Sequence, residues 1–233
     1  MRRHLRLFPG FFALLAGAVC AIQPQDAPRP SVTFDLFWDA ATPQSYRITV
    51  DTTGSARYES HTPPRPGEGR SATPSEQDDF EMTFVISKAT RHQIFQMAQE
   101  LDYFNGNWDF SKHAMANTGK KTLTYADSSR KFQTTYNYSE SKAVQRITAI
   151  FQGISLTLEH GRRLQFLHRF DRLGLDAELR AMEDMAKNND LVELQLIGPT
   201  LRKIADDTRI MNMARQRCLR LLKHAESQFP EAR

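Results

Sequence analysis

Cysteine is scarce in this chain of 233 residues, which contains only Cys20 and Cys218. Two cysteines cannot form a framework of several disulfides, so the stability of the fold has to come from a packed core. Long hydrophobic runs are also missing. The one extended apolar stretch, near the N-terminus, is shorter than the roughly 20 residues that a helix needs to cross a bilayer. The sequence therefore excludes a disulfide-rich scaffold and a membrane-spanning bundle.

Recognisable catalytic and ligand-binding motifs are lacking as well. The histidines are scattered, and no pair of them has the spacing of a zinc-binding helix. Residues 118–122 include a Gly-Lys pair, but Ala114 stands where a phosphate-binding loop needs its other glycine. No Gly-x-Ser-x-Gly elbow is present. These absences favour a non-catalytic protein over an enzyme, and we expect neither a metal nor a cofactor.

The first 21 residues have the order of a signal peptide. Three arginines lie within the first six residues, and an apolar run over residues 7–19 follows them before the chain becomes polar. Such an order is typical of a cleavable leader. We predict cleavage after Ala21, with cleavage after Ala18 as the alternative, and hence a periplasmic or secreted protein. A further alternative is a lipid anchor on Cys20, although the three residues before it do not match a lipoprotein signal.

The charge of the chain is unevenly distributed. Composition is that of an ordinary globular protein, with 40% hydrophobic and 25% charged residues and a net charge of +4, which falls to +1 without the leader. Residues 22–110 carry 7 basic and 13 acidic side chains, whereas residues 111–233 carry 21 basic and 14 acidic ones. This asymmetry predicts either that the halves dock on each other or that the basic half meets an acidic partner, while the small overall charge disfavours nucleic acid.

The first half of the mature chain shows the two-residue alternation of β-strands. Thr90 and Gln93 form a candidate capping box for a helix that runs to about Phe104. A segment rich in proline and glycine over residues 60–79 predicts a long mobile loop. The expected strands cover residues 32–38, 46–50, 56–58, 80–86, 123–125 and 132–136.

The second half shows helical spacing from Ser141 onward. One apolar stripe continues past Gly161 to Leu173, and Asp176 is a candidate N-cap for the next helix. A third helix covers residues 191–204 with a break at residues 198–199, and the last starts near Asp207 and ends near residue 225.

The complete pattern predicts an α+β fold, in which a small antiparallel sheet with one packed helix is followed by an all-helical C-terminal part. The expected division is a signal peptide over residues 1–21, a flexible tail over 22–31, an α+β domain over 32–138, a helical region over 139–227 and a tail over 228–233.

The last predicted helix is amphipathic. Cys218 falls on its apolar side, which predicts a buried and unreactive thiol. Met182 and Met185 share a helix face, and these two residues, together with Met211 and Met213, are expected to pack in the core rather than to bind metal. The polar side carries the candidate contact residues for a polyanion or a membrane surface, which are Arg209, Arg217, Arg220 and Lys223.

Two stretches, residues 46–104 and 201–222, resemble uncharacterised exported bacterial proteins of a domain-of-unknown-function type, a resemblance that carries no specific motif and implies no activity. The helical end also resembles a single unit of a HEAT-type repeat.

Three functions follow from these observations. The favoured one is a non-catalytic exported protein that binds another protein or an envelope component. The second is an enzyme whose site is assembled from distant residues, such as His113 with Asp109 or His168 with Asp171. The third is peripheral contact with a polyanion or a membrane through the basic C-terminal helix.

Overall fold

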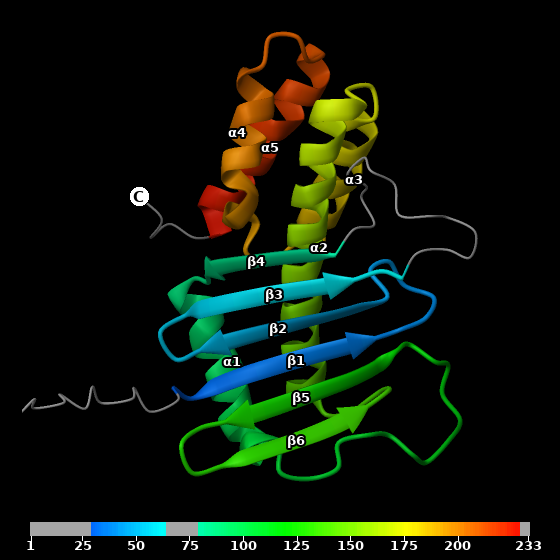
Figure 1. Ribbon diagram of the computed structural model, residues 1–233, viewed down its shortest axis with the longest axis vertical. Coiled ribbons are helices and arrows are strands. Elements are labelled where there is room, and N and C mark those ends of the chain that lie inside the picture. The colour runs from blue at the N-terminus through cyan, green and yellow to red at the C-terminus, as the bar shows by residue number, and fades with distance from the viewer. Residues whose placement is uncertain (1–28, 64–78, 229–233) are drawn as a thin grey trace, which may run out of the picture.

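The computed structural model describes residues 29–63 and 79–228, which form a six-stranded antiparallel sheet and a helical bundle that rises past one edge of it (Figure 1). The α+β class predicted from the sequence is confirmed. The strand order is β4-β3-β2-β1-β5-β6, and every neighbouring pair is antiparallel. The strands are β1 (Ser31–Phe37), β2 (Ser45–Asp51), β3 (Ser55–His61), β4 (Phe80–Val85), β5 (Lys120–Ala126) and β6 (Lys131–Tyr136).

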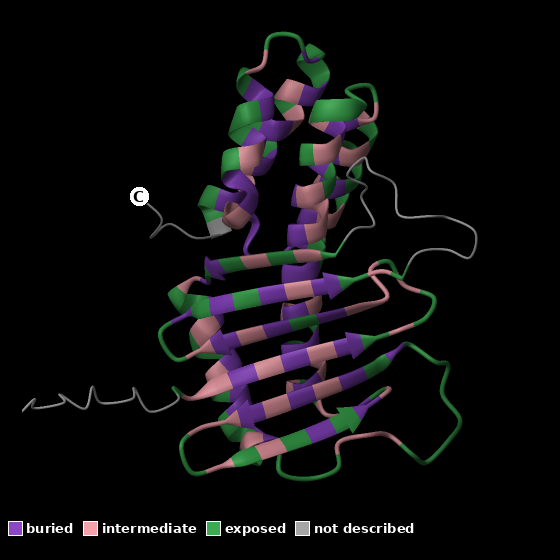
Figure 2. Cartoon of the chain, in the orientation of Figure 1, coloured by how far each residue is buried: buried purple, intermediate pink, exposed green. Residues whose placement is uncertain are grey.

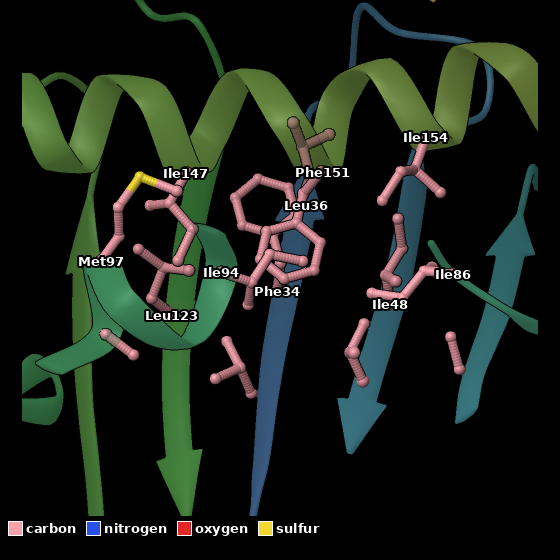
Figure 3. Packing of buried hydrophobic residues seen from close by; sticks show 14 of the residues in the cluster. Phe34, Leu36, Ile48, Ile86, Ile94, Met97, Leu123, Ile147, Phe151 and Ile154 are labelled. Atoms are coloured by element: carbon pink, nitrogen blue, oxygen red, sulfur yellow. The ribbon is translucent and has the colours of Figure 1, made fainter. Parts of the chain in front are cut away.

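The alternation along each strand places apolar side chains on the face that the helices cover. In β1, Val32, Phe34 and Leu36 are buried, whereas the residues between them stay partly open to solvent. Phe34 stacks on Phe151 of the long helix α2 (Lys142–Phe170), with ring centroids 5.2 Å apart and nearly parallel planes. Figure 3 shows this pair at the centre of the cluster between sheet and helices. The opposite face of the sheet is polar.

Helix α1 (Lys88–Glu100) begins one turn earlier than its predicted capping box. The N-cap is Ser87, whose hydroxyl accepts the backbone N–H of Thr90 at 3.2 Å. Ser87 also donates from its backbone N–H and its hydroxyl to the carboxylate of Glu193, at 2.9 and 2.7 Å. Glu193 is fully buried and comes from the bundle, so a distant residue completes this helix terminus.

Helix α2 joins the sheet to the bundle. Its N-terminal half covers the sheet beside α1, so two helices pack on this face where the sequence predicted one (Figure 1). Its middle approaches the segment before helix α4 (Gly198–Asp206) very closely. A Cβ atom at Gly153 would lie 2.5 Å from a methyl group of Val192, and one at Gly161 would lie 2.3 Å from a methyl group of Ile197. Both glycines therefore allow a neighbouring segment to pack closely against α2, and neither of them breaks the helix.

The bundle consists of the C-terminal half of α2, α3 (Leu175–Lys187), α4 and α5 (Asn212–Gln228). Its core is separate from that of the sheet and includes Met182 and Cys218, both fully buried as predicted. The prediction that Met211 and Met213 pack in the core was wrong, because these side chains are 50% and 59% exposed. Met211 lies just before α5 and Met213 in its first turn, ahead of Ala214, where the buried stripe of the helix begins.

Three helix boundaries in the bundle differ from the prediction. Gly174, not Asp176, is the N-cap of α3, and Asp176 lies in the first turn. The expected helix over residues 191–204 is a short 3-10 helix (Leu194–Ile197) followed by α4, which begins where Pro199 was expected to break it. Proline is well accommodated there because the first helical N–H groups have no helical acceptor. Asp207 caps the C-terminus of α4 instead of starting α5.

The predicted loop over residues 60–79 is shorter at its start, because Ser60 and His61 belong to β3. Most of this loop, the predicted signal peptide and nearly all of the predicted tail before β1 lie outside the described residues.

Candidate functional site

Two hollows in the described part of the chain contrast in the charge of their lining residues. The larger, of about 770 Å³, lies at one end of the sheet and is lined by side chains of both charge signs. Within it Arg47 pairs with Asp35, with Nε 2.6 Å from Oδ1, and His61 pairs with Asp79, while Lys120 also lines it. Four acidic side chains and two basic ones line this hollow, so it does not favour an anionic ligand.

The second hollow, of about 570 Å³, is lined by basic and neutral residues, and we call it the basic groove. It lies between the C-terminal end of α2, the start of α4 and the turn before α5. Among the described residues, no acidic side chain lines it. Its lining residues are Gln165, His168, Arg169, Arg172, Pro199, Thr200, Lys203 and Arg209.

Helical spacing explains why these side chains gather. On α2 and just beyond it, residues 165, 168, 169 and 172 lie three or four positions apart and so share one face, as do residues 199, 200 and 203 of α4. The two faces are joined by a hydrogen bond from Gln165 Nε2 to the hydroxyl of Thr200, at 3.1 Å. The N-terminus of α4, with its partial positive charge, lies at the same place.

Asp207 holds one wall of the groove in place. Its carboxylate accepts two hydrogen bonds from the Arg209 guanidinium, each 2.9 Å long, and lies 3.0 Å from His168 Nε2. Hydrogen bonds from Arg209, and then from His168, hold the pKa of Asp207 well below its usual range. Asp207 thus offsets part of the positive charge but does not line the groove.

The other cations of the groove are exposed. Arg169, Arg172 and Lys203 all have exposed side chains. The guanidinium of Arg169 lies 5.0 Å from the ring centroid of Phe170, and Arg172 Nε makes only a long contact, 3.4 Å, with the carbonyl oxygen of His168. These side chains can therefore turn toward a ligand at little cost.

The four candidate contact residues predicted on the last helix lie in three different environments. Arg209 lines the basic groove, and Lys223 is exposed on α5. Arg217 and Arg220 face α3, where Arg217 Nε lies 2.8 Å from Asp176 and Arg220 Nε lies 2.6 Å from Glu183. Arg217 also pairs with Glu183. The charges of Arg217 and Arg220 are thus largely balanced within the bundle.

The sequence did not identify Arg169, Arg172 and Lys203 as site residues. They occur on the polar sides of two helices, where basic residues are common, and no local signal shows that these sides face one another. Arg169 lies at the end of α2 and Arg172 three residues later in the turn that follows, but the contribution of α4 depends on how the helices pack.

In neither of the two pairs suggested for an enzyme is the histidine bonded to the acid. His168 bonds to Asp207, while the carboxylate of Asp171 accepts the backbone N–H of Gly174 at 3.3 Å. Asp109 accepts the backbone N–H groups of Asn137 and its neighbour, at 2.9 and 3.4 Å. His113 is exposed.

No group of three or more histidine, cysteine or acidic side chains within residues 29–63 and 79–228 has the geometry to hold a metal ion. The helices in those ranges are also too short or too polar to cross a membrane. Neither the known protein-family models nor the curated proteins include a match to this chain.

Proposed function

We propose that the protein is a non-catalytic binding protein whose basic groove receives an anionic group of a macromolecular partner. The observation that carries this proposal is the convergence of Arg169, Arg172, Lys203 and Arg209 around one hollow with no acidic lining residue. Guanidinium groups present paired N–H donors that match the oxygens of phosphate and carboxylate groups, and lysine adds a mobile point charge.

Binding explains the polar groups of the groove better than catalysis does. His168 is bonded to Asp207, and the hydroxyl of Thr200 already accepts a hydrogen bond from Gln165. A carboxylate partner of this kind can orient a histidine as a general base, but among the described residues that line the groove His168 is not bonded to a hydroxyl or thiol that could act as a nucleophile. What the groove offers a ligand is positive charge and hydrogen-bond donors.

The charge asymmetry of the sequence supports the same function. Ion pairs such as Arg57 with Glu81 and Arg217 with Glu183 lie within one half of the chain. The basic surplus of the second half supports contact with an acidic external partner. Together with the leader, this supports a role in the periplasm or outside the cell, with an envelope component as the partner.

Retention on immobilised heparin tests the anion-binding function. The variant R169Q/R172Q/K203Q should elute at much lower salt, because three cations are removed from the groove while the residues that hold its walls remain. The slope of log affinity against log salt should fall by about one for each charge that contacted the polyanion.

The matched control is K88Q/K131Q/K142Q, which removes the same charge from three exposed positions outside the groove. This control should elute close to the wild type. Equal weakening of both variants would show that binding depends only on overall charge, and the proposed function would then be wrong.

A further inference from the structure

Exposed apolar side chains concentrate at the end of the bundle farthest from the sheet. The turn between α2 and α3 and the turn between α4 and α5 both lie at this end (Figures 1 and 2). Of the ten exposed large hydrophobic residues in the described part of the chain, four lie in or directly beside these turns. They are Phe170, Leu173, Met211 and Met213, and Leu173 is the most exposed of all ten, at 80%.

Cations of the basic groove alternate with these apolar residues along the chain. Arg169 and Arg172 each precede an exposed apolar residue by one position, and Arg209 precedes Met211 by two. The last turn of α2 and the turn after α4 are joined by the contact between His168 and Asp207. Apolar and basic groups therefore belong to one end of the molecule, which we call the bundle tip.

Three acidic residues also lie at the bundle tip, and two of them are engaged by the protein. Asp207 is bonded to Arg209 and His168, and Asp171 accepts the backbone N–H of Gly174. Asp206 is exposed at the end of α4. The lining of the basic groove remains basic and neutral, so a positive site borders the exposed apolar residues.

We propose that the bundle tip docks on a bilayer that contains anionic phospholipid. In this arrangement the basic groove receives a lipid phosphate, while Leu173, Phe170 and Met211 enter the headgroup region. The inference rests on the proposed function, since it names the partner of the same groove. Basic residues next to a membrane are attracted to anionic lipid, and apolar side chains that enter the interface add to the affinity.

A bilayer fits the bundle tip better than a soluble anion or an acidic protein surface. A soluble polyanion would neutralise the groove but leave Leu173 and Met211 in water. A membrane interface covers apolar groups and presents phosphates at the same depth, so both sets of side chains are satisfied together.

Co-sedimentation with two kinds of vesicle tests the inference. The mature protein should bind vesicles of phosphatidylcholine with about one third phosphatidylglycerol, and bind pure phosphatidylcholine much more weakly. The variant L173S/M211S should bind the anionic vesicles about tenfold more weakly because it removes apolar groups from the interface. Its retention on heparin should be unchanged.

The control variant L156S/L219S removes two exposed leucines away from the bundle tip and should bind vesicles like the wild type. As a second measurement, tryptophan fluorescence of an L173W variant should be quenched by brominated lipid in anionic vesicles. A variant L156W should not be quenched.

Each possible negative result has a different meaning for the two proposals. Retention on heparin through the groove without binding to anionic vesicles would leave the proposed function standing and overturn the membrane inference, pointing to an acidic polymer or protein. Wild-type affinity of L173S/M211S together with an unquenched L173W would overturn insertion of the tip. Loss of both heparin and vesicle binding in the wild type would remove the proposed function as well.

Discussion

At the residue scale, the roles of several residues depend on the atoms that pack against them. Gly153 and Gly161 cannot be told apart, from the sequence, from glycines that break a helix. In the structure each permits a close contact that a methyl group on its Cα atom would block. Glu193 has a left-handed backbone, with φ of 60°, and a fully buried carboxylate, which is costly unless every oxygen is paired. Its hydrogen bonds to Ser87 and Gln195 meet that requirement.

Cys218 should be unreactive in the folded protein. Its side chain is fully buried, and burial raises the pKa of the thiol to about 12, so almost no thiolate is present at neutral pH. In a C20A background, a thiol reagent should label the protein only when denaturant is added. The variant L219C provides the control, because this neighbouring position is 47% exposed and its thiol should react at once. Fast labelling of Cys218 itself would contradict the described packing of α5.

At the element scale, the termini of helices connect parts of the fold that are distant in sequence. The N-terminus of α1 is completed by Glu193 from the other end of the chain, and the turn after α4 is held by Arg209 and by His168 of α2. Between α3 and α5, Glu183 bonds to Arg217 and Arg220. Polar contacts of this kind fix how the helices are arranged once the apolar faces have packed.

Replacing Glu193 by alanine should lower the free energy of unfolding by about 1–3 kcal/mol, because the donors of Ser87 lose a buried acceptor. The change is measured by urea denaturation. E193A and S87A should be less than additive in combination, since both remove the same contact. E100A, at an exposed position at the other end of α1, should change stability by less than about 0.5 kcal/mol. Additive effects would show that the contact contributes little.

The stability of the bundle should decrease in acid partly through Glu183. Burial alone would raise the pKa of this carboxyl group, but hydrogen bonds from Arg220 and Arg217 outweigh it and lower the pKa below the ordinary value of 4.5. The folded state therefore favours the carboxylate, and this contribution is complete above pH 4.5 and is lost as the pH falls through the lowered pKa.

Melting temperatures measured across this acidic range test the effect of Glu183. E183Q should be less stable than the wild type at neutral pH, and the difference between them should shrink on acidification. E226Q, at an exposed position on α5, should follow the wild-type profile. A constant difference between E183Q and wild type at every pH would contradict the role of the charge.

At the scale of the whole molecule, α2 is the element that makes the sheet and the bundle one structure. Its N-terminal half belongs to the core of the sheet and its C-terminal half to the core of the bundle. The polar face of the sheet and the bundle tip are therefore held apart at opposite parts of the molecule.

Export should be visible in the mass of the mature protein. Because the first 21 residues have the order of a cleavable leader, protein recovered from the periplasm or the medium should begin near residue 22. N-terminal sequencing and intact mass measure this directly. A start at Cys20 with a lipid mass would support the lipid anchor instead, and the uncut chain as the stable product would contradict export.

The order and type of most helices and strands could be predicted from the sequence. Two-residue alternation located all six strands, because a sheet covered on one face imposes that period on its apolar residues, as Val32, Phe34 and Leu36 illustrate. The helical stripe through Phe151 and the apolar side of α5 followed in the same way. The local pattern also placed Cys218 in the core.

Three features depend on contacts between distant parts of the chain and could not be predicted: the cap of α1, the pairing of strands β1 and β5, and the basic groove. Strands β1 and β5 are far apart in the chain, and Ser87 depends on a glutamate 106 residues away. The groove combines Arg169 of α2, Lys203 of α4 and Arg209 of the following turn. Exposed basic residues follow no regular spacing in the sequence, because any solvent-facing side of a helix tolerates them. The packing of the helices therefore determines which of them come together.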